Sequence, residues 1–307
     1  MDTNIWTASA VSNAILQGNP NLEMVLCNYL KAYIHRLGQY DINLQGLSSM
    51  EQLTPKVLEG IAQLEEMRKE LLAVLEMFAT SNHPALERYL PVFFQNLLTF
   101  YEERGINLYT GTTPDVLRND HYRFFNQFLL ISLSALLIDN RCFSALAAIL
   151  HAKFKVFNRS FQMTRDVNFI YLQKYNYTLN QFLNTNSPKR ISVTADYMRN
   201  YSGPIDFEKM MKADILLYYI SLWFNIGDTL DPFWFPELSV YNRNIEMLPD
   251  MVSKKYFKEA KVLFGVDTVD EYKKLLAESP DPLQRNGMLM VPQLKVGLLY
   301  NTVGSGE

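Results

Sequence analysis

The chain contains little of the chemistry by which motifs identify a protein. Among its 307 residues are 2 cysteines and 4 histidines, and its 13 glycines are spread singly. The phosphate-binding patterns G-x-x-x-x-G-K-[ST] and G-x-G-x-x-G do not occur, which excludes the usual nucleotide-binding loops. The patterns C-x-x-C, H-E-x-x-H and G-x-S-x-G are missing too. The sequence therefore predicts neither a metal site nor a cofactor.

Disulfides and membrane segments are not indicated either. Cys27 and Cys142 lie far apart, each within an apolar helical pattern that suits a buried thiol. Residues 1–16 have no basic start and no sustained apolar run, unlike a signal peptide. The most apolar window, Phe124 to Ile138, contains polar residues and is shorter than the roughly 20 residues needed to cross a bilayer. We expect a cytoplasmic chain that does not associate with membranes.

The sequence is rich in helix-forming patterns. Hydrophobic residues make up 48% of the chain and charged residues 20%, values typical of a protein with a substantial core. Apolar positions at helical spacing, with matching capping residues, predict a series of helices. Their approximate ranges are 20–37, 54–78, 84–104, 124–138, 141–154, 165–183, 195–199, 250–264 and 268–278. Pro91 is expected to kink or divide the third, and Arg68 interrupts the apolar seam of the second.

One apolar segment is ambiguous. Residues 215–224 are continuously apolar except for Ser221, and periodicity does not separate a buried helix from a buried strand there. We favour a helix because Asp206 can cap the run that leads into this segment. The prediction is an all-α multi-helix bundle, with strands confined at most to a short pair near residues 294–300.

Three regions are expected along the chain. Residues 1–110 would form an N-terminal helical hairpin region, residues 111–278 a central and C-terminal helical domain, and residues 279–307 an irregular tail. The hairpin prediction rests on the apolar stripes of residues 20–37 and 54–78, which can pack as two antiparallel helices.

Catalytic arrangements are poorly supported. Helical nucleases that use an Arg and a His four to six residues apart need both on one helical face. Here Arg118 precedes His121 by three residues and Arg141 precedes His151 by ten. Cys142 with either histidine could form a nucleophile and a base, but a buried structural cysteine is favoured.

A group of acidic residues surrounds a tryptophan in the C-terminal half. Asp228, Asp231 and Glu237 near Trp234 resemble a carboxylate pair beside a sugar-stacking ring. An ordinary surface loop is the better interpretation of this segment, and we assign no catalytic residue.

The feature that stands out is a basic, aromatic stretch between residues 151 and 201. Residues 1–150 carry 10 Lys and Arg against 15 Asp and Glu, whereas residues 151–307 carry 19 against 17. The candidate nucleic-acid-binding residues in the stretch are Lys153, Lys155, Arg159, Arg165, Lys174, Lys189 and Arg190. Aromatic residues lie between them, and cations beside stacking rings are what single-stranded nucleic acid requires. The alternative is that the rings face the core and the cations form a solvated surface.

Short aromatic and apolar segments follow one another along the central and C-terminal part of the chain. They are Tyr122-Arg123-Phe124-Phe125 with the run to Leu137, Arg141-Cys142-Phe143, Ala213 to Tyr218, Phe235 to Leu238, and Tyr256-Phe257 with Leu263 to Val266. From about Tyr122 to Leu276 this succession resembles an uncharacterised helical region of bacterial proteins, some of them associated with antiphage defence. The resemblance implies a bacterial, cytoplasmic protein with an accessory or sensing role beside a separate effector, and it supplies no catalytic residue.

Two functions follow from these observations. The first is a non-enzymatic α-helical interaction or sensor module, which binds a protein partner or a second copy through the N-terminal hairpin. The second is a nucleic-acid-binding protein or helical nuclease that uses residues 151–201. Convergence of the candidate cations on one concave surface would favour the second.

Overall fold

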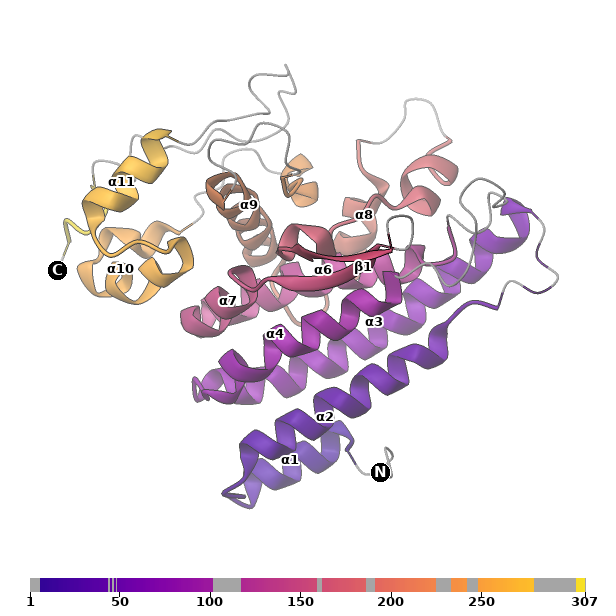
Figure 1. Ribbon diagram of the computed structural model, residues 1–307, viewed down its shortest axis with the longest axis horizontal. Helices are drawn as coiled ribbons and strands as arrows, with labels where there is room; N and C mark the ends of the chain where they lie inside the picture. The colour runs from indigo at the N-terminus through magenta and orange to yellow at the C-terminus, as the bar shows by residue number, and fades with distance from the viewer. Residues whose placement is uncertain are drawn as a thin grey trace.

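A computed structural model describes residues 6–43, 45, 47, 49–101, 117–158, 162–185, 191–224, 233–241, 248–278 and 302–306. Within these residues the predicted all-α fold is confirmed, because the chain is a bundle of packed helices with one two-stranded sheet (Figure 1). The α-helices are α1 (Ala8–Leu16), α2 (Leu22–Leu37), α3 (Met50–Thr80), α4 (Ala85–Leu97), α6 (Asp120–Asp139), α7 (Phe143–Leu150), α8 (Val193–Asn200), α9 (Phe207–Phe224), α10 (Lys254–Ala260) and α11 (Val269–Glu278). The strands are β1 (Phe154–Asn158) and β2 (Met163–Val167).

Single turns of 3-10 or π helix connect these elements. They are η2 (Gly38–Tyr40), η3 (Leu98–Tyr101), η4 (Phe169–Leu172), η5 (Thr178–Phe182), η6 (Glu237–Val240), η7 (Pro249–Val252) and η8 (Lys261–Phe264). Residues 302–306 lie beside η7, where the N–H of Gly304 bonds to the carbonyl of Met251. The strand expected near residues 294–300 lies outside the described residues.

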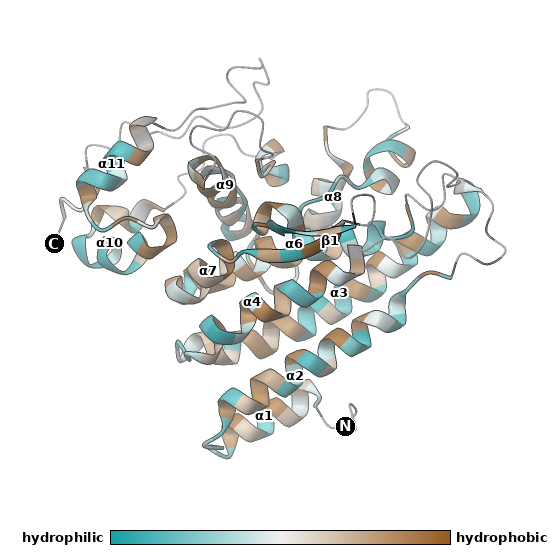
Figure 2. Cartoon of the chain, viewed as in Figure 1, coloured by the Kyte–Doolittle hydropathy of each residue, from teal (hydrophilic) through white to brown (hydrophobic). Residues whose placement is uncertain are grey.

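Helix α6 is the centre of the bundle. Every residue from Asp120 to Leu137 except Arg123 is buried, because this helix has apolar side chains on nearly all its faces. Helices α3 and α9 both pack against it, and α4 packs against α7 and α2. Figure 2 shows hydrophilic residues on the outer helices α10 and α11, at one end of the molecule. Each large apolar side chain removed from water in this core contributes about 1.5–3 kcal/mol before entropy costs.

Several predicted helix boundaries are confirmed by their capping contacts. The N–H of Lys209 bonds to the Asp206 carboxylate at 3.1 Å, and residues 215–224 continue α9 as a helix. The capping box before α11 is also formed, since the N–H of Glu271 bonds to Thr268 Oγ1 at 3.1 Å. At these two boundaries the local caps were therefore interpreted correctly.

The cap expected at Thr54 was wrong, and of the kink or division expected at Pro91 the division does not occur. Helix α3 begins at Met50, four residues before the expected cap Thr54, and Pro55 lies inside it. Helix α4 passes through Pro91 without a division. A proline removes one backbone hydrogen bond, and the burial of Leu53 and Leu90 at these places holds the backbone helical.

The helices expected over residues 141–154 and 165–183 were also partly wrong. Helix α7 ends at Leu150, and β1 pairs antiparallel with β2, with Phe154 opposite Val167 and Asn158 opposite Met163. Burial alternates along β1, where Phe154 and Val156 are buried and Lys155 and Phe157 are exposed, as a half-buried strand requires.

After β2, hydrogen bonds to asparagine and aspartate side chains hold the chain in place, where the predicted helix would have used backbone hydrogen bonds. Asn168 Oδ1 accepts the N–H of Ile170 at 3.1 Å and starts η4. The N–H of Thr178 bonds to the Asp120 carboxylate at 2.6 Å, which ties η5 to the first turn of α6. These local contacts compete with an α-helix, so residues 165–183 form short turns.

Candidate functional site

The hairpin of β1 and β2 is attached to α4 by one glutamine. The N–H of Lys155 bonds to Gln95 Oε1 at 2.7 Å, and Gln95 Nε2 donates to the Lys155 carbonyl at 2.8 Å. The side-chain amide of Gln95 thus pairs with β1 as another strand would. One edge of the small sheet is covered by α4 in this way.

A second glutamine joins η4 to a distant segment. Gln173 Nε2 donates to the Phe235 carbonyl at 2.7 Å, and Gln173 Oε1 accepts the Phe235 N–H at 2.6 Å. The two bonds hold Phe233, two residues earlier in the chain, beside the residues that follow β2.

Gln173 is also one of the residues that line a hollow of 460 Å³. Its lining residues are Lys153, Arg165, Asp166, Val167, Asn168, Ile170, Tyr171, Gln173, Lys174 and Phe233. Residues 165, 166 and 167 are consecutive in β2, and consecutive strand side chains point to opposite faces of a sheet. The hollow borders all three of them, together with Lys153, which precedes β1.

Three cations meet at this hollow. Lys174 Nζ lies 3.1 Å from the centre of the Tyr171 ring and Arg165 Cζ 5.3 Å from it, while Lys153 lines the same space. Within the described residues none of the three pairs with a carboxylate, and Asp166 pairs with Lys155 at 3.7 Å. Three positive charges beside one carboxylate, that of Asp166, leave a positive potential in a partly enclosed space.

Lys174 experiences this environment most strongly. It is half-buried, and desolvation lowers its pKa to about 8, with further lowering by the positive charges of Arg165 and Arg123. Burial and nearby like charges both disfavour an ammonium ion. An anion in the hollow would reverse the second effect.

The structure thus brings some of the predicted cations together and places others elsewhere. Lys153, Arg165 and Lys174 line the hollow, whereas Lys155 does not. Arg159, Lys189 and Arg190 lie outside the described residues. The domain boundaries and the binding role of these residues stay predictions.

The aromatic residues of the basic stretch divide into two groups. Phe154 and Phe169 are buried in the core, as the alternative interpretation expected. Tyr175 is 54% exposed and Phe157 47% exposed. Tyr175 directly follows Lys174 in the chain, and its exposed ring packs edge-on against Tyr177, with 4.9 Å between the ring centres.

The histidine and cysteine arrangements do not form. Burial lowers the pKa of His121 to about 4, and its Nε2 lies 3.0 Å from the Tyr40 carbonyl. Burial raises the pKa of the Cys142 thiol to about 11, and its Sγ donates to the Ala79 carbonyl. Arg118 pairs with Asp41 at 2.7 Å, and each group thus has a structural partner of its own.

The segment around Trp234 is not the surface loop that we expected. Trp234 is fully buried, and its indole N–H donates to Asp214 at 2.7 Å. The other carboxylate oxygen of Asp214 accepts the N–H of Leu238 at 2.8 Å, and burial raises the pKa of Asp214 to about 7. Asp228 and Asp231 lie outside the described residues. In the sequence, the position of Asp214 as an isolated acidic residue within the apolar segment 213–224 was the feature that could have indicated this contact.

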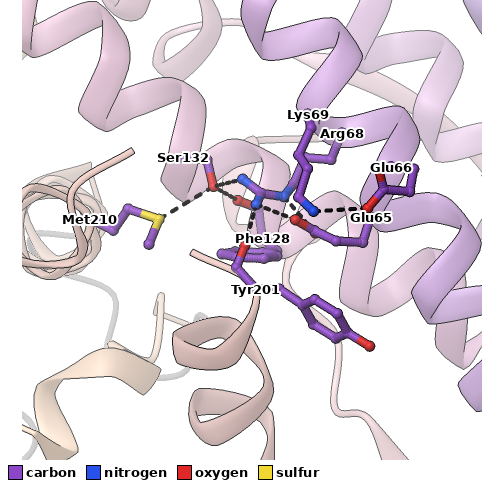
Figure 3. Close-up of polar contacts among 8 residues, drawn as sticks. All are labelled: Glu65, Glu66, Arg68, Lys69, Phe128, Ser132, Tyr201 and Met210. Carbon is purple, nitrogen blue, oxygen red and sulfur yellow. Dashed lines mark hydrogen bonds and ion pairs between the residues drawn. The ribbon is translucent and has the colours of Figure 1, made fainter. Parts of the chain in front are cut away.

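A second buried charge cluster lies between α3 and α6 (Figure 3). Arg68 donates to the Glu65 carboxylate at 2.8 and 2.6 Å, to Ser132 Oγ at 2.7 Å and to the Tyr201 carbonyl at 2.6 Å. Its guanidinium also covers the Phe128 ring at 3.8 Å. Because the fold supplies its partners and it is fully buried, the cluster is structural.

The described residues contain no group of three or more His, Cys, Asp or Glu side chains that could hold a metal ion. Among the same residues no helix has the length and apolar character needed to cross a membrane. No family model, curated protein or solved structure matches the chain.

Proposed function

We propose that the protein is a non-enzymatic helical binding module whose ligand is single-stranded nucleic acid. The observation that carries the proposal is the convergence of Lys153, Arg165 and Lys174 on one hollow without a carboxylate partner among the described residues. Cations so arranged neutralise phosphates, and phosphate neutralisation supplies most of the sequence-independent affinity for nucleic acid.

The rings near the hollow support different roles. Lys174 occupies a face of Tyr171, so this ring positions the cations. Phe233 lines the hollow, and Tyr175, which follows Lys174 in the chain, is exposed, so these rings are the ones we expect to stack on bases.

The N-terminal helices leave less surface for a partner than their sequence indicated. Their apolar stripes, including Tyr29, Tyr33 and Leu71, are buried within the chain itself. Leu16 and Met24 are exposed and are where a protein partner would bind. In that second function, Leu16→Ser with Met24→Ser would prevent co-purification of the partner and leave nucleic-acid binding intact.

Fluorescence anisotropy with labelled single strands of DNA and RNA tests the first function. We expect binding at low ionic strength, with a slope of log affinity against log salt of about −2 if three phosphates are neutralised. Arg165→Glu should abolish binding. Lys255→Glu is the matched control, because Lys255 is exposed on α10, away from the hairpin in Figure 1. Absence of salt-sensitive binding to any strand would refute the proposal.

A further inference from the structure

The hollow has a backbone donor in addition to its cations. Both the N–H and the carbonyl of Lys155 bond to Gln95, so Lys155 and its partner Asp166 form a pair without hydrogen bonds to each other. The N–H of Asp166 consequently points away from β1, and Asp166 is among the residues that line the hollow. None of the described residues accepts this N–H.

The charges of the lining residues also suit a particular ligand. Three cations and one carboxylate line the hollow, which leaves two positive charges when all four are ionised (three minus one). An internal phosphodiester carries one negative charge. A phosphate monoester carries about −1.5 to −2 at pH 7 and presents three strong acceptor oxygens. The net charge therefore matches a monoester better than a diester.

Among the described residues, Lys174 and Arg165 have an aromatic ring as a partner and no paired carboxylate. Tyr171 holds Lys174 and Arg165 near one another, and like charges at close range disfavour the folded state. The cluster at Arg68 shows that this fold supplies a carboxylate where a cation is structural. An external anion accounts for the arrangement at the hollow.

We infer that the hollow binds the terminal phosphate monoester of a nucleic-acid strand, with Lys153, Arg165, Lys174 and the N–H of Asp166 as donors to its oxygens. The inference rests on the proposed function. It narrows the part of the ligand that the hollow binds from any phosphate along a strand to the phosphate at a phosphorylated end. Inorganic phosphate or a mononucleotide presents related chemistry, so the experiment must separate these sources.

Anisotropy titrations with one short sequence in four forms provide the test: phosphorylated at the 5′ end, at the 3′ end, at both ends or at neither. We expect at least one phosphorylated form to bind about tenfold more tightly than the unphosphorylated strand. Arg165→Gln should remove the difference, and Lys255→Gln should preserve it.

A pair of variants tests the backbone donor. Asp166→Asn keeps the N–H and removes a negative charge, so the phosphorylated strand should bind more tightly. Asp166→Pro removes the N–H and the charge together, and it should bind more weakly than Asp166→Asn. Proline is tolerated where the N–H of an edge strand is unpaired, and circular dichroism and melting temperature verify the fold.

The outcomes separate the inference from the proposed function. If the wild type bound all four forms with equal affinity and Arg165→Gln bound none of them, the inference would be overturned. The proposal that the hollow binds nucleic acid would be retained. No binding of any form would overturn both. Inorganic phosphate or a mononucleotide could also compete as strongly as the phosphorylated strand does. That result would assign the hollow to a free phosphate compound and overturn the inference that it binds the end of a strand.

Discussion

The rings of Phe128 and Tyr171 each carry a cation, and the surroundings of the two cations differ. Arg68 lies over Phe128 at 3.8 Å and is fully buried among a carboxylate, a hydroxyl and a carbonyl that accept its hydrogen bonds. Lys174 lies over Tyr171 at 3.1 Å, is half-buried, and has other cations as its charged neighbours. The first cation is fully satisfied by the fold, and the second is not.

This difference separates a structural charge from one available to a ligand. A buried ion is tolerated when the chain surrounds it with partners, and removing one partner then exposes the cost of burial. A cation held beside like charges at an open hollow has lost hydration without gaining a counter-ion. Perturbed charges of that second kind concentrate at functional sites.

The largest expected effect comes from breaking the satisfied cluster. Arg68→Met leaves the Glu65 carboxylate buried without its partner, so the free energy of unfolding should fall by about 3–5 kcal/mol in chemical denaturation. Glu65→Gln combined with Arg68→Met should recover part of the loss. Lys69→Met is the control, since its pair with Glu66 is exposed and contributes about 0–1 kcal/mol. A loss in Arg68→Met as small as in the control would contradict the structural role.

A smaller effect is expected from the buried acid Asp214. Its pKa is about 7 in the folded chain against an ordinary 3.8, so between these pH values the folded state binds more protons than the unfolded state. Stability should therefore fall as pH rises through this window, by up to about 1.4 kcal/mol per pH unit for a single group. Asp214→Asn removes the titration and should make the fall shallower.

Denaturant unfolding at a series of pH values measures this slope. Glu237 has a pKa raised to about 6 by burial, so some slope should persist in Asp214→Asn. Asp139→Asn, at an exposed ion pair, is the control and should leave the slope unchanged. Identical slopes in the wild type and Asp214→Asn would show that Asp214 ionises as it does in the unfolded chain.

The helices were predictable from the sequence because their determinants are local. The stripe of α2, the apolar run of α6 and the cap at Thr268 each involve residues within a few turns of one another. The hairpin was not predictable, because it depends on Gln95, which lies about sixty residues earlier in the chain. Each of its strands has five residues, and in so short a segment the spacing of apolar residues does not distinguish a strand from a helix.

The sequence indicated the chemical character of the candidate site, but it did not indicate which residues come together to form it. An excess of cations among aromatics identified the segment that contains Lys153, Arg165 and Lys174. Which of those cations converge depends on the pairing of β1 with β2 and on the contact of Gln173 with Phe235, both of them tertiary features. The structural role of Arg68 was visible only as a polar residue within an apolar seam.

The last prediction concerns Lys174, the cation that pairs with no carboxylate among the described residues. Its replacement should have the smallest effect on the free energy of unfolding and should not lower it. The pKa of Lys174 is lowered from 10.5 to about 8, so between these values the unfolded state binds more protons and stability should rise with pH. Lys174→Met removes this dependence, and at neutral pH it should change stability by no more than about 0.5 kcal/mol or raise it.

The same substitution should weaken binding of the phosphorylated strand by about tenfold, because it removes one of the three cations that line the hollow. In the wild type, affinity should decline as pH rises past about 8, when Lys174 loses its proton while Arg165 stays charged. Unfolding curves and anisotropy titrations on the same samples would measure both effects. If Lys174→Met lost as much stability as Arg68→Met while retaining full affinity, Lys174 would be a structural cation, and the distinction between the two rings would fail.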